Sequence, residues 1–487
     1  MADELPSLHT EAFRRQAHQV VDWMADYLAR VGTLPVQPSL DPGAIRALLP
    51  PDAPDAPEPF ERIVEDFERL IVPGLTHWGH PGFFAYFPAN SSPPSILAEM
   101  LTATIGAQCM SWNTSPAATE LEQVTMEWLR KMTGLPDAFT GVIQDTASTA
   151  TLVALITARD ETLRRSDAKT LAEDGKTGGR EVGKLTVYAS EEAHSSVAKG
   201  ARMAGFSPDR VRAIPADDVF AMRSEALAQA ISVDRAAGLS PACVVATVGT
   251  TSSTGIDPVP DVADICQGEK TWLHIDAAWG GSAAIVPEMR WIFAGVERAD
   301  SVVFNPHKWM LVNFDCTAFF VRDTEALLRS FATSPVFLKA AHDGRVVNFR
   351  DWGIQLGRRF RALKLWFVIR TYGAQGLRAM IREHIRLGAL LARWVQEEPE
   401  FELMAPAPLG LVVFRYKGAG ERGAREIDAL NERLLAALHA TGKIMLTQTR
   451  LKGKYAIRLA LGHLTTTEQH VRDAWELIKN AARQLPP

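Results

Sequence analysis

Short apolar runs alternate with segments of helical period through the middle of the chain. The runs have strand length and are bounded by polar or glycine-containing segments, whereas segments such as 149–165 and 261–267 have the length and pattern of helices. Five such runs occur, at residues 141–144 (GVIQ), 185–189 (LTVYA), 243–249 (CVVATVG), 271–275 (TWLHI) and 301–305 (SVVFN). Apolar strands alternating with helices predict an α/β fold whose largely parallel sheet is covered on both faces.

The two ends of the chain have different patterns. Residues 10–31 form an amphipathic stripe with Thr10 as a plausible N-cap, and a proline-rich stretch follows up to Pro59. This helix is therefore either a projecting arm or a helix folded back on its own chain. Near the C-terminus, LVVFRY, KIMLTQT and YAIRLAL alternate with helices and predict a smaller α/β unit. We expect an N-terminal helical arm and dimerisation segment (1–92), a large domain (93–368) and a small C-terminal domain (369–487).

Composition narrows the classes of partner. The 487 residues carry a net charge of −5 and are 47% hydrophobic, so no basic field favours nucleic acid or an anionic membrane. The start of the chain shows no secretory signal pattern, and no apolar run is long enough for a spanning helix. Four cysteines without CxxC spacing favour free thiols over disulfides or a zinc site. We expect a cytoplasmic protein that binds a small molecule and holds no metal.

Polar residues follow the predicted strands at their carboxyl ends, where open α/β sheets bind ligands. Asp276 follows TWLHI, Lys308 follows SVVFN, and His194 follows LTVYA within SEEAHSS. Two further loops add small and hydroxyl-bearing residues, namely Thr146, Ala147 and Ser148 at a helix start, and Thr250 and Thr251. Each has an ordinary alternative: a snorkelling lysine, a helix-capping acid or a structural histidine.

Taken together, these residues form a chemically coherent set. They supply an amine that can form an imine, an acid that can keep a ring nitrogen protonated, an aromatic base and a helix N-terminus for phosphate. Pyridoxal 5'-phosphate requires that set. The one competing motif, GAGERG at 418–423, matches GxGxxG, but the next strand ends in Gln448 and Thr449 without an acid. We interpret it as a loop.

Several motifs resemble those of one known family. NPHKW, HIDAAWGGSA, GVIQDTAST, EEAHSS, HWGHPGFFAYFP and LGRRFRALKLWFV are similar to segments of the group II pyridoxal-phosphate decarboxylases, in particular members that act on aromatic L-amino acids. The resemblance spans about residues 10–480. It implies a type I pyridoxal-phosphate fold like that of aspartate aminotransferase, and an intertwined homodimer whose N-terminal arm packs on the partner subunit. The implied activity is decarboxylation of a DOPA-, tyrosine-, phenylalanine- or tryptophan-type substrate.

The resemblance also implies residue roles. Lys308 is the expected Schiff-base lysine, Asp276 the partner of the pyridine nitrogen, and His194 the residue stacked on the cofactor ring. The remaining expected cofactor contacts are Ala278 beneath the ring, Thr251 beside it, and Ala147, Ser148, Asn305 and His307 around the phosphate. The expected substrate pocket comprises Trp78, Tyr86, Phe87, Pro88 and Gly357, with Met110 from the neighbouring chain. Core packing is the ordinary alternative for Trp78 and Tyr86.

One position departs from the family's amine-forming members. Their mobile loop carries a tyrosine that helps to reprotonate the substrate carbon, and this chain has Phe337 there. A phenyl ring has no proton to donate. Phenylalanine here resembles aromatic aldehyde synthases, in which O2 intercepts the reaction to give aldehyde, ammonia and hydrogen peroxide. Alternatively, His342, His194 or a loop water supplies the proton and the product is the amine.

Two other functions remain open at the level of sequence. An aminotransferase would hold the substrate carboxylate with an arginine, for which Arg458 in YAIRLAL is the candidate. A sensor or scaffold that keeps the fold without chemistry is the non-enzymatic alternative.

Overall fold

The computed structural model describes residues 10–166, 182–332 and 345–485. A seven-stranded sheet forms the centre of the large domain, with strand order β1-β7-β6-β5-β4-β2-β3. β7 is antiparallel to both its neighbours, and the other pairs are parallel. Its strands are β1 (Thr140–Gln144), β2 (Leu185–Ser190), β3 (Val211–Ile214), β4 (Ser240–Thr247), β5 (Trp272–Asp276), β6 (Ser301–Phe304) and β7 (Thr317–Val321).

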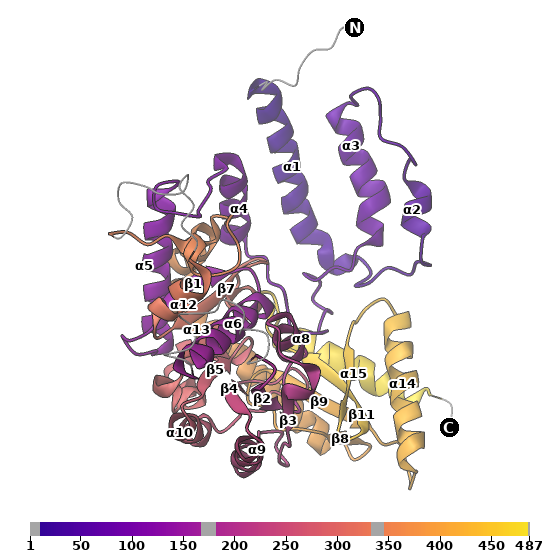
Figure 1. Cartoon of the computed structure of the whole chain (residues 1–487). Helices are drawn as coiled ribbons and strands as arrows, with labels where there is room; N and C mark the ends of the chain where they lie inside the picture. The colour runs from indigo at the N-terminus through magenta and orange to yellow at the C-terminus, as the bar shows by residue number, and fades with distance from the viewer. Residues whose placement is uncertain (1–9, 167–181, 333–344, 486–487) are drawn as a thin grey trace.

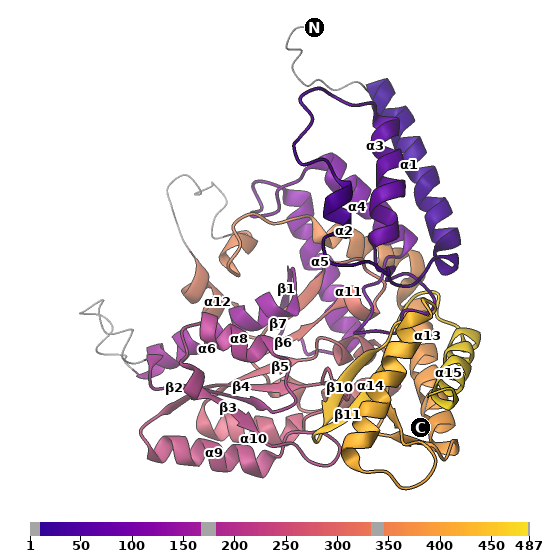
Figure 2. The ribbon, with the colours of Figure 1, turned by 90° about the vertical axis from the view of Figure 1, so that its right-hand side faces the viewer.

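Helices cover both faces of this sheet, which is why β5 is buried at every position and β4 at all but its first (Figure 2). Along β4, Val244 packs into one core layer and Val245 into the opposite one, as the two-residue period of a strand requires. One layer contains α6 (Ala147–Ser166), α8 (Ser196–Met203) and α12 (Thr324–Phe331). The other contains α5 (Pro116–Thr133), α9 (Ser224–Ala236), α10 (Val259–Glu269) and part of α13 (Arg361–Glu397).

A second sheet forms the small domain. Its strand order is β10-β11-β9-β8, and every pair is antiparallel. The domain contains β8 (Phe401–Leu403), β9 (Leu411–Tyr416), β10 (Thr447–Leu451), β11 (Lys454–Ala460), α14 (Ala424–Ala440) and α15 (Glu468–Arg483). Helix α13 leads into it across a break at Gly373, whose φ is 65°.

An arm formed by residues 10–75 projects from the body of the molecule (Figure 1). It consists of α1 (Thr10–Arg30), α2 (Ala44–Leu48) and α3 (Phe60–Asp66), and α4 (Pro93–Ile105) is the next α-helix along the chain. Trp23 of α1 donates to Glu68 at 2.5 Å and packs edge-on against Phe67. No residue of α1 is buried. Helix α1 thus packs on a later segment of its own chain, and the two together form the projecting part; its role as a dimerisation arm stays a prediction.

The predicted α/β fold is confirmed, including the largely parallel sheet and the small second sheet. The GAGERG segment lies outside helices and strands, as predicted, between β9 and α14. Sequence reasoning missed β3, β7 and β8. It also began the KIMLTQT strand too early, because β10 starts at Thr447. The predicted domain limits remain a prediction.

A buried polar network supports the β2–β3 edge of the sheet. Tyr188 of β2 donates to Asp234 of α9 at 2.8 Å, and Arg212 of β3 forms two hydrogen bonds to the same carboxylate, at 2.6 and 2.9 Å. Burial raises the pKa of Asp234, but the bonds from Arg212 and Tyr188 outweigh it, so the net pKa is lowered. The folded state therefore stabilises the charged carboxylate.

We expect Asp234→Asn to lower the free energy of unfolding by about 2–3 kcal/mol at neutral pH, because Arg212 loses its charged partner. The folded pKa is depressed, so the wild-type advantage is complete above the ordinary aspartate pKa of 3.8 and is lost as the pH falls through the lowered value. Urea unfolding from pH 7 to pH 3 measures this. The control is Asp218→Asn, which removes an exposed ion pair to Lys452 and should leave stability nearly unchanged. If both variants lowered the free energy of unfolding equally, the stabilising role assigned to the Asp234–Arg212 pair would be contradicted.

Candidate active site

A cavity of about 250 Å³ lies at the carboxyl edge of the large sheet. Strands β1, β2, β4, β5 and β6 all end there, so each strand delivers the residues that follow it. The cavity is lined by Phe87, Thr146, Ala147, Ser148, His194, Ser196, Thr247, Gly249, Thr251, Asp276, Ala278, Trp279, Asn305, His307, Lys308 and Phe314. The structure thus brings together every predicted cofactor residue. Their individual roles remain predictions.

Lys308 lies in the four-residue helix α11 (Pro306–Trp309), which directly follows β6. Its backbone N–H donates to the Asn305 carbonyl at 3.0 Å, and its Nζ lies 5.4 Å from the centre of the Phe87 ring. Burial lowers the pKa of the Lys308 ammonium. The Asp276 carboxylate opposes that shift and the Arg458 charge adds to it. A lowered pKa increases the share of neutral amine, which is the nucleophilic form.

Asp276 is the last residue of β5, and its side chain is buried at 4% exposure. Its Oδ1 accepts a hydrogen bond from the Ala278 N–H at 3.0 Å, and its backbone carbonyl accepts one from Val248. Asp276 also aligns with Val303 of the neighbouring parallel strand β6. The carboxylate is therefore rigidly placed beside the turn that carries Lys308.

His194 follows β2, and its ring nitrogens have different environments. Nδ1 accepts from the Ser196 N–H at 3.2 Å and lies 2.8 Å from the Ser196 hydroxyl. This network assigns the proton of the neutral ring to Nε2. Burial lowers the pKa of His194, with Asp276 opposing and Lys308 adding to the shift. The ring can therefore offer one N–H donor while remaining uncharged near neutral pH.

The N-terminus of α6, where the phosphate seat is predicted, lies at the cavity. Residues 146–148 line the cavity there, and the Thr146 hydroxyl also accepts from the Thr149 N–H at 3.4 Å. Backbone N–H groups at a helix start attract anions. His307 also lines the cavity, with its Nδ1 accepting from the Cys316 N–H, and burial lowers its pKa to about 3. A neutral His307 thus keeps an Nε2–H for donation.

These residues fit pyridoxal phosphate. One cavity is lined by the groups that this cofactor needs. They are the amine of Lys308, the buried carboxylate of Asp276, the imidazole of His194, the small side chain of Ala278 and the N-terminus of α6, which attracts anions. Lys308 would hold the cofactor aldehyde, Asp276 the ring nitrogen and the α6 N-terminus the phosphate.

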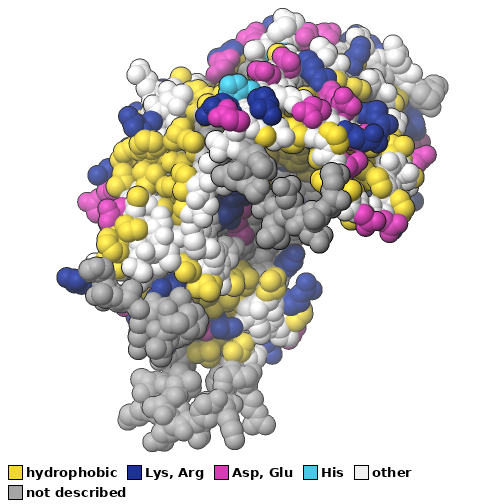
Figure 3. All heavy atoms as spheres, turned by 90° about the horizontal axis from the view of Figure 1, so that it is seen from above, with side chains coloured by type: hydrophobic (Ala, Val, Ile, Leu, Met, Phe, Trp, Pro, Cys, Tyr) yellow, Lys and Arg dark blue, Asp and Glu magenta, His cyan; other side chains and the backbone are white. Residues whose placement is uncertain are grey.

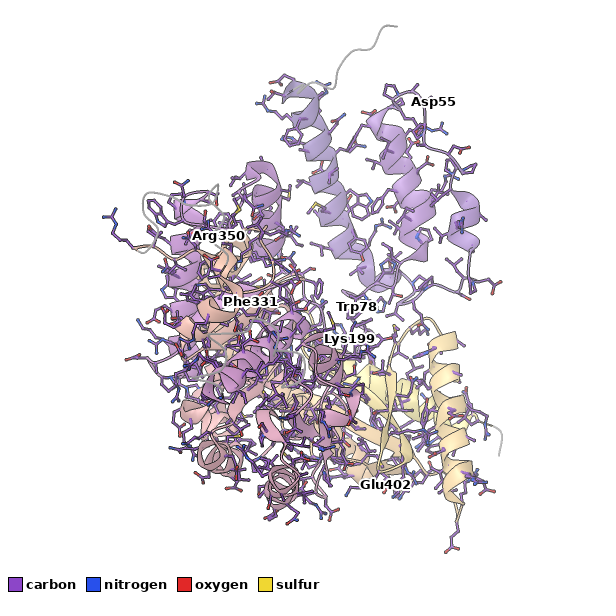
Figure 4. The ribbon with its side chains drawn as sticks, viewed as in Figure 1. Asp55, Trp78, Lys199, Phe331, Arg350 and Glu402 are labelled. Atoms are coloured by element: carbon purple, nitrogen blue, oxygen red, sulfur yellow. The ribbon has the colours of Figure 1, made fainter. Side chains whose placement is uncertain are left out.

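The predicted substrate residues are only partly brought together. Phe87 lines the cavity, and Pro88 is buried next to it. Trp78 lies at the foot of the arm (Figure 4). The rings of Trp78 and Tyr86 stack with centroids 5.7 Å apart but remain 38% and 51% exposed. Core packing is therefore excluded for both. Phe337 and His342 lie outside the described residues.

Gly357 and Met110 lie on two segments joined to each other. Arg358 donates its N–H to the Gln108 side chain at 2.6 Å, and its carbonyl accepts from Cys109. A Cβ added at Gly357 would lie 3.3 Å from Gln108 Nε2, so this glycine makes room for that amide. Neither Met110 nor Gly357 lines the cavity of the single chain.

Sequence reasoning missed several residues of the site. Thr247, Gly249, Ser196, Trp279 and Phe314 line the cavity without having been singled out. Trp279 directly follows Ala278 in HIDAAWGG, so its place in that motif could have indicated it. Arg458, the arginine candidate, is buried but does not line the cavity.

The described part of the chain contains no helix both long and apolar enough to cross a membrane. Within residues 10–166, 182–332 and 345–485, no group of three or more histidine, cysteine or acidic side chains could hold a metal ion. All four cysteines are buried free thiols.

Comparison with known proteins gives consistent matches over the whole chain. The pyridoxal-dependent decarboxylase conserved domain matches residues 42–417. Aromatic-L-amino-acid decarboxylase of Sus scrofa is 47% identical, over 98% of each chain. Phenylacetaldehyde synthase of Arabidopsis thaliana is 41% identical, over 99% of this chain and 98% of that protein. The crystal structure of Oryza sativa TDC with PLP and tryptamine superimposes with a TM-score of 0.95 at 38% identity, covering 99% of both chains.

Proposed function

This chain belongs to the pyridoxal-dependent decarboxylase family, and from that premise we propose that it converts aromatic L-amino acids to the amine and CO2. The family establishes the type I pyridoxal-phosphate fold, the cofactor and a carboxy-lyase of the aromatic-L-amino-acid decarboxylase type. The prediction of an enzyme is thereby confirmed. The observation that carries the proposal is the cavity in which Lys308, Asp276, His194 and the aromatic ring of Phe87 meet.

Bound pyridoxal phosphate supplies an aldehyde for the substrate amine and a pyridinium ring that accepts the electron pair left by departing CO2. In the proposed mechanism, Lys308 Nζ binds the cofactor between turnovers and yields its place to the substrate amine. Its lowered pKa makes Nζ a proton acceptor during that exchange. After CO2 has left, the same amine is positioned to carry a proton back.

In this proposal Asp276 acts on the ring nitrogen of the cofactor, and His194 acts on the substrate carboxylate. The Asp276 carboxylate, fixed by the Ala278 N–H, keeps the ring nitrogen protonated by ion pairing in a buried setting. His194 presents a flat ring to stack on the cofactor, and its Nε2–H can donate to the substrate carboxylate and orient it. An uncharged donor orients this carboxylate without a full positive charge that would oppose its departure.

The aromatic preference rests on the wall beside Lys308. Phe87 offers an apolar face inside the cavity, and the Trp78–Tyr86 stack continues the aromatic surface outward. Aromatic rings are matched by such walls through offset and edge contacts. The similarity to Oryza sativa TDC, solved with tryptamine, supports including indolic substrates in the proposed range.

A second candidate product is the aldehyde, and Phe337 is the observation that favours it. Without a phenolic proton at position 337, O2 and water can convert the amine carbon to an aldehyde, releasing ammonia and hydrogen peroxide. The similarity to phenylacetaldehyde synthase supports this candidate, whereas the greater identity to aromatic-L-amino-acid decarboxylase supports the amine. An aminotransferase is the least supported alternative, because Arg458 does not reach the cavity lining.

The arm supports a homodimer. Phe13, Val21 and Leu28 of α1 are 54%, 39% and 44% exposed, and Leu97, Leu101 and Ile105 expose a second apolar stripe on α4. Hydrophobic side chains gather into broad patches on the face seen from above (Figure 3). Exposed apolar stripes of this extent favour a protein partner. A second copy is the partner we propose, with Met110 contributed to the neighbouring pocket. Buried reduced thiols further support the cytoplasm as its location.

Lys308→Ala is expected to lower CO2 release from aromatic L-amino acids by more than about a thousandfold, because the nucleophile and proton carrier is lost. A radiometric CO2 assay on protein saturated with cofactor measures the effect. Lys199→Ala is the matched control, since Lys199 is an exposed lysine on α8 (Figure 4). Normal turnover by Lys308→Ala would refute the assignment.

The Phe337 hypothesis predicts that wild-type enzyme makes one aldehyde, one ammonia and one hydrogen peroxide for each CO2, using one O2 and one water. Phe337→Tyr should then lower the peroxide formed per CO2 by about tenfold or more, because a proton donor competes with O2. Oxygen electrode readings and product chromatography give both ratios. Phe337→Leu is the control and should retain the wild-type product. Stoichiometric amine without O2 uptake by the wild type would eliminate the aldehyde candidate.

Sedimentation equilibrium is expected to give wild-type protein twice the mass of one chain. Leu101→Glu should shift it toward the monomer and weaken turnover, because a charge is buried at the proposed interface. Val233→Glu is the control: Val233 on α9 is 56% exposed and should tolerate the same change. A monomeric wild type, or dissociation by both variants alike, would contradict the proposed interface.

A further inference from the structure

Three aromatic rings form a continuous stack beside the cavity. Phe87 and Trp279 stack with centroids 4.2 Å apart at 14°, and Trp279 and Trp309 with centroids 4.1 Å apart at 8°. Both indoles are essentially buried, at 1% and 0% exposure. Each ring is part of the site or adjoins it in sequence: Phe87 lines the wall, Trp279 follows Ala278, and Trp309 follows Lys308. The distances between the stacked rings therefore fix the distances between Phe87, the turn at Ala278 and the turn at Lys308.

The stack is anchored to the small domain and α13 by both indole N–H groups. Trp279 Nε1 donates to the Leu409 carbonyl at 2.8 Å, and Trp309 Nε1 donates to His384 Nδ1 at 3.0 Å. His384 is 1% exposed, and its Nε2 lies 3.1 Å from the His463 carbonyl. One neutral tautomer, protonated at Nε2, satisfies both contacts at once. Burial lowers the pKa of His384 to about 4, so that tautomer is maintained near neutral pH.

Close packing leaves the stack little room to shift. A Cβ added at Gly462 would lie 2.7 Å from Trp279 and 3.3 Å from Trp309. The buried Asn90 donates to the carbonyls of Lys308 and Gly462 at 2.7 and 2.9 Å, and its Oδ1 accepts from the Leu464 N–H. The turn carrying Lys308 is thus held on one side by Asn90 and on the other by the Trp309 indole.

We propose that Trp309 and His384 are positioning residues for Lys308. Their hydrogen bond joins the lysine turn of the large domain to α13, and the ring stack transmits that position to Ala278 and Phe87. The inference rests on the proposed role of Lys308. Trp309 and His384 do not touch the reacting atoms, since neither lines the cavity. They fix the position of Lys308 Nζ, and the affinity for pyridoxal phosphate depends on that position.

The test measures the dissociation constant of pyridoxal phosphate from apoprotein, together with urea unfolding. Trp309→Phe and His384→Leu are each expected to raise that constant about tenfold, the equivalent of one buried hydrogen bond. The double variant should match either single one, because both lose the same contact. His384→Asn retains an acceptor near Nδ1 and should recover affinity to within about threefold of the wild type.

Trp272→Phe is the matched control. Trp272 is buried and donates its indole N–H to Ser301 at 2.9 Å, but it begins β5, at the end of the strand remote from the cavity. It should lower stability as Trp309→Phe does while leaving the dissociation constant within about twofold. An effect of Trp272→Phe on affinity equal to that of Trp309→Phe, or no effect of Trp309→Phe, would overturn the proposal.

Borohydride reduction followed by mass spectrometry separates this inference from the role of Lys308. Wild-type and Trp309→Phe protein saturated with cofactor should retain it covalently at Lys308, and Lys308→Ala should not. Retention by Lys308→Ala would refute the role of the lysine. If Lys308→Ala loses the covalently bound cofactor but Trp309→Phe binds pyridoxal phosphate as tightly as the wild type, only the positioning role of Trp309 is refuted.

Discussion

The ammonium of Lys308 is held where water stabilises its charge poorly, and the rest of the site is arranged around that constraint. Burial lowers the pKa of Lys308, and the Asp276 carboxylate acts against that shift. The two groups meet because β5 and β6 are parallel neighbours, in a register that aligns Asp276 with Val303. A parallel pair delivers both strand ends to one edge, whereas an antiparallel pair would have separated them. The sheet therefore determines the electrostatics of the lysine before any loop contributes.

The sheet edge alone leaves one side of Lys308 open, and distant segments close it. Asn90 from the end of the N-terminal segment and Gly462 from the small domain meet at the lysine turn. Phe87, whose ring centre lies 5.4 Å from Lys308 Nζ, is itself held by its stack on Trp279. These contacts join residues separated by hundreds of positions, so their formation requires both domains to be docked. The site is consequently a property of the assembled chain, and a cofactor bound there would stabilise the docked arrangement by mass action.

The parts of the site that follow strands were predictable, and the parts that depend on docking were not. Asp276, Lys308 and His194 each follow an apolar run, and parallel strands bring such positions to a common edge. The prediction of the fold from these runs is confirmed. Trp309 and His384 carry no such signal, because their hydrogen bond joins helices 75 positions apart and each residue alone looks like ordinary core. The strand β7 was missed although TAFFV is apolar, since its antiparallel direction breaks the strand–helix alternation on which the prediction relied.

Arg458 is buried close to the cavity but outside its lining, and this position matters for a reaction that removes a carboxylate. Its Nη1 donates to the Thr447 hydroxyl at 2.8 Å, and its guanidinium lies 5.4 Å from the Phe87 ring centre, outside the cavity lining. Thr447 in turn accepts from the N–H of Tyr86, whose φ of 53° is a conformation that costs a non-glycine residue free energy. The arginine thus supports the strained backbone of the aromatic wall. A cation bonded to the substrate carboxylate would stabilise its charge, and that stabilisation would be lost as neutral CO2 forms. Holding the arginine outside the cavity lining removes this penalty, and the orientation proposed for the uncharged His194 avoids it as well.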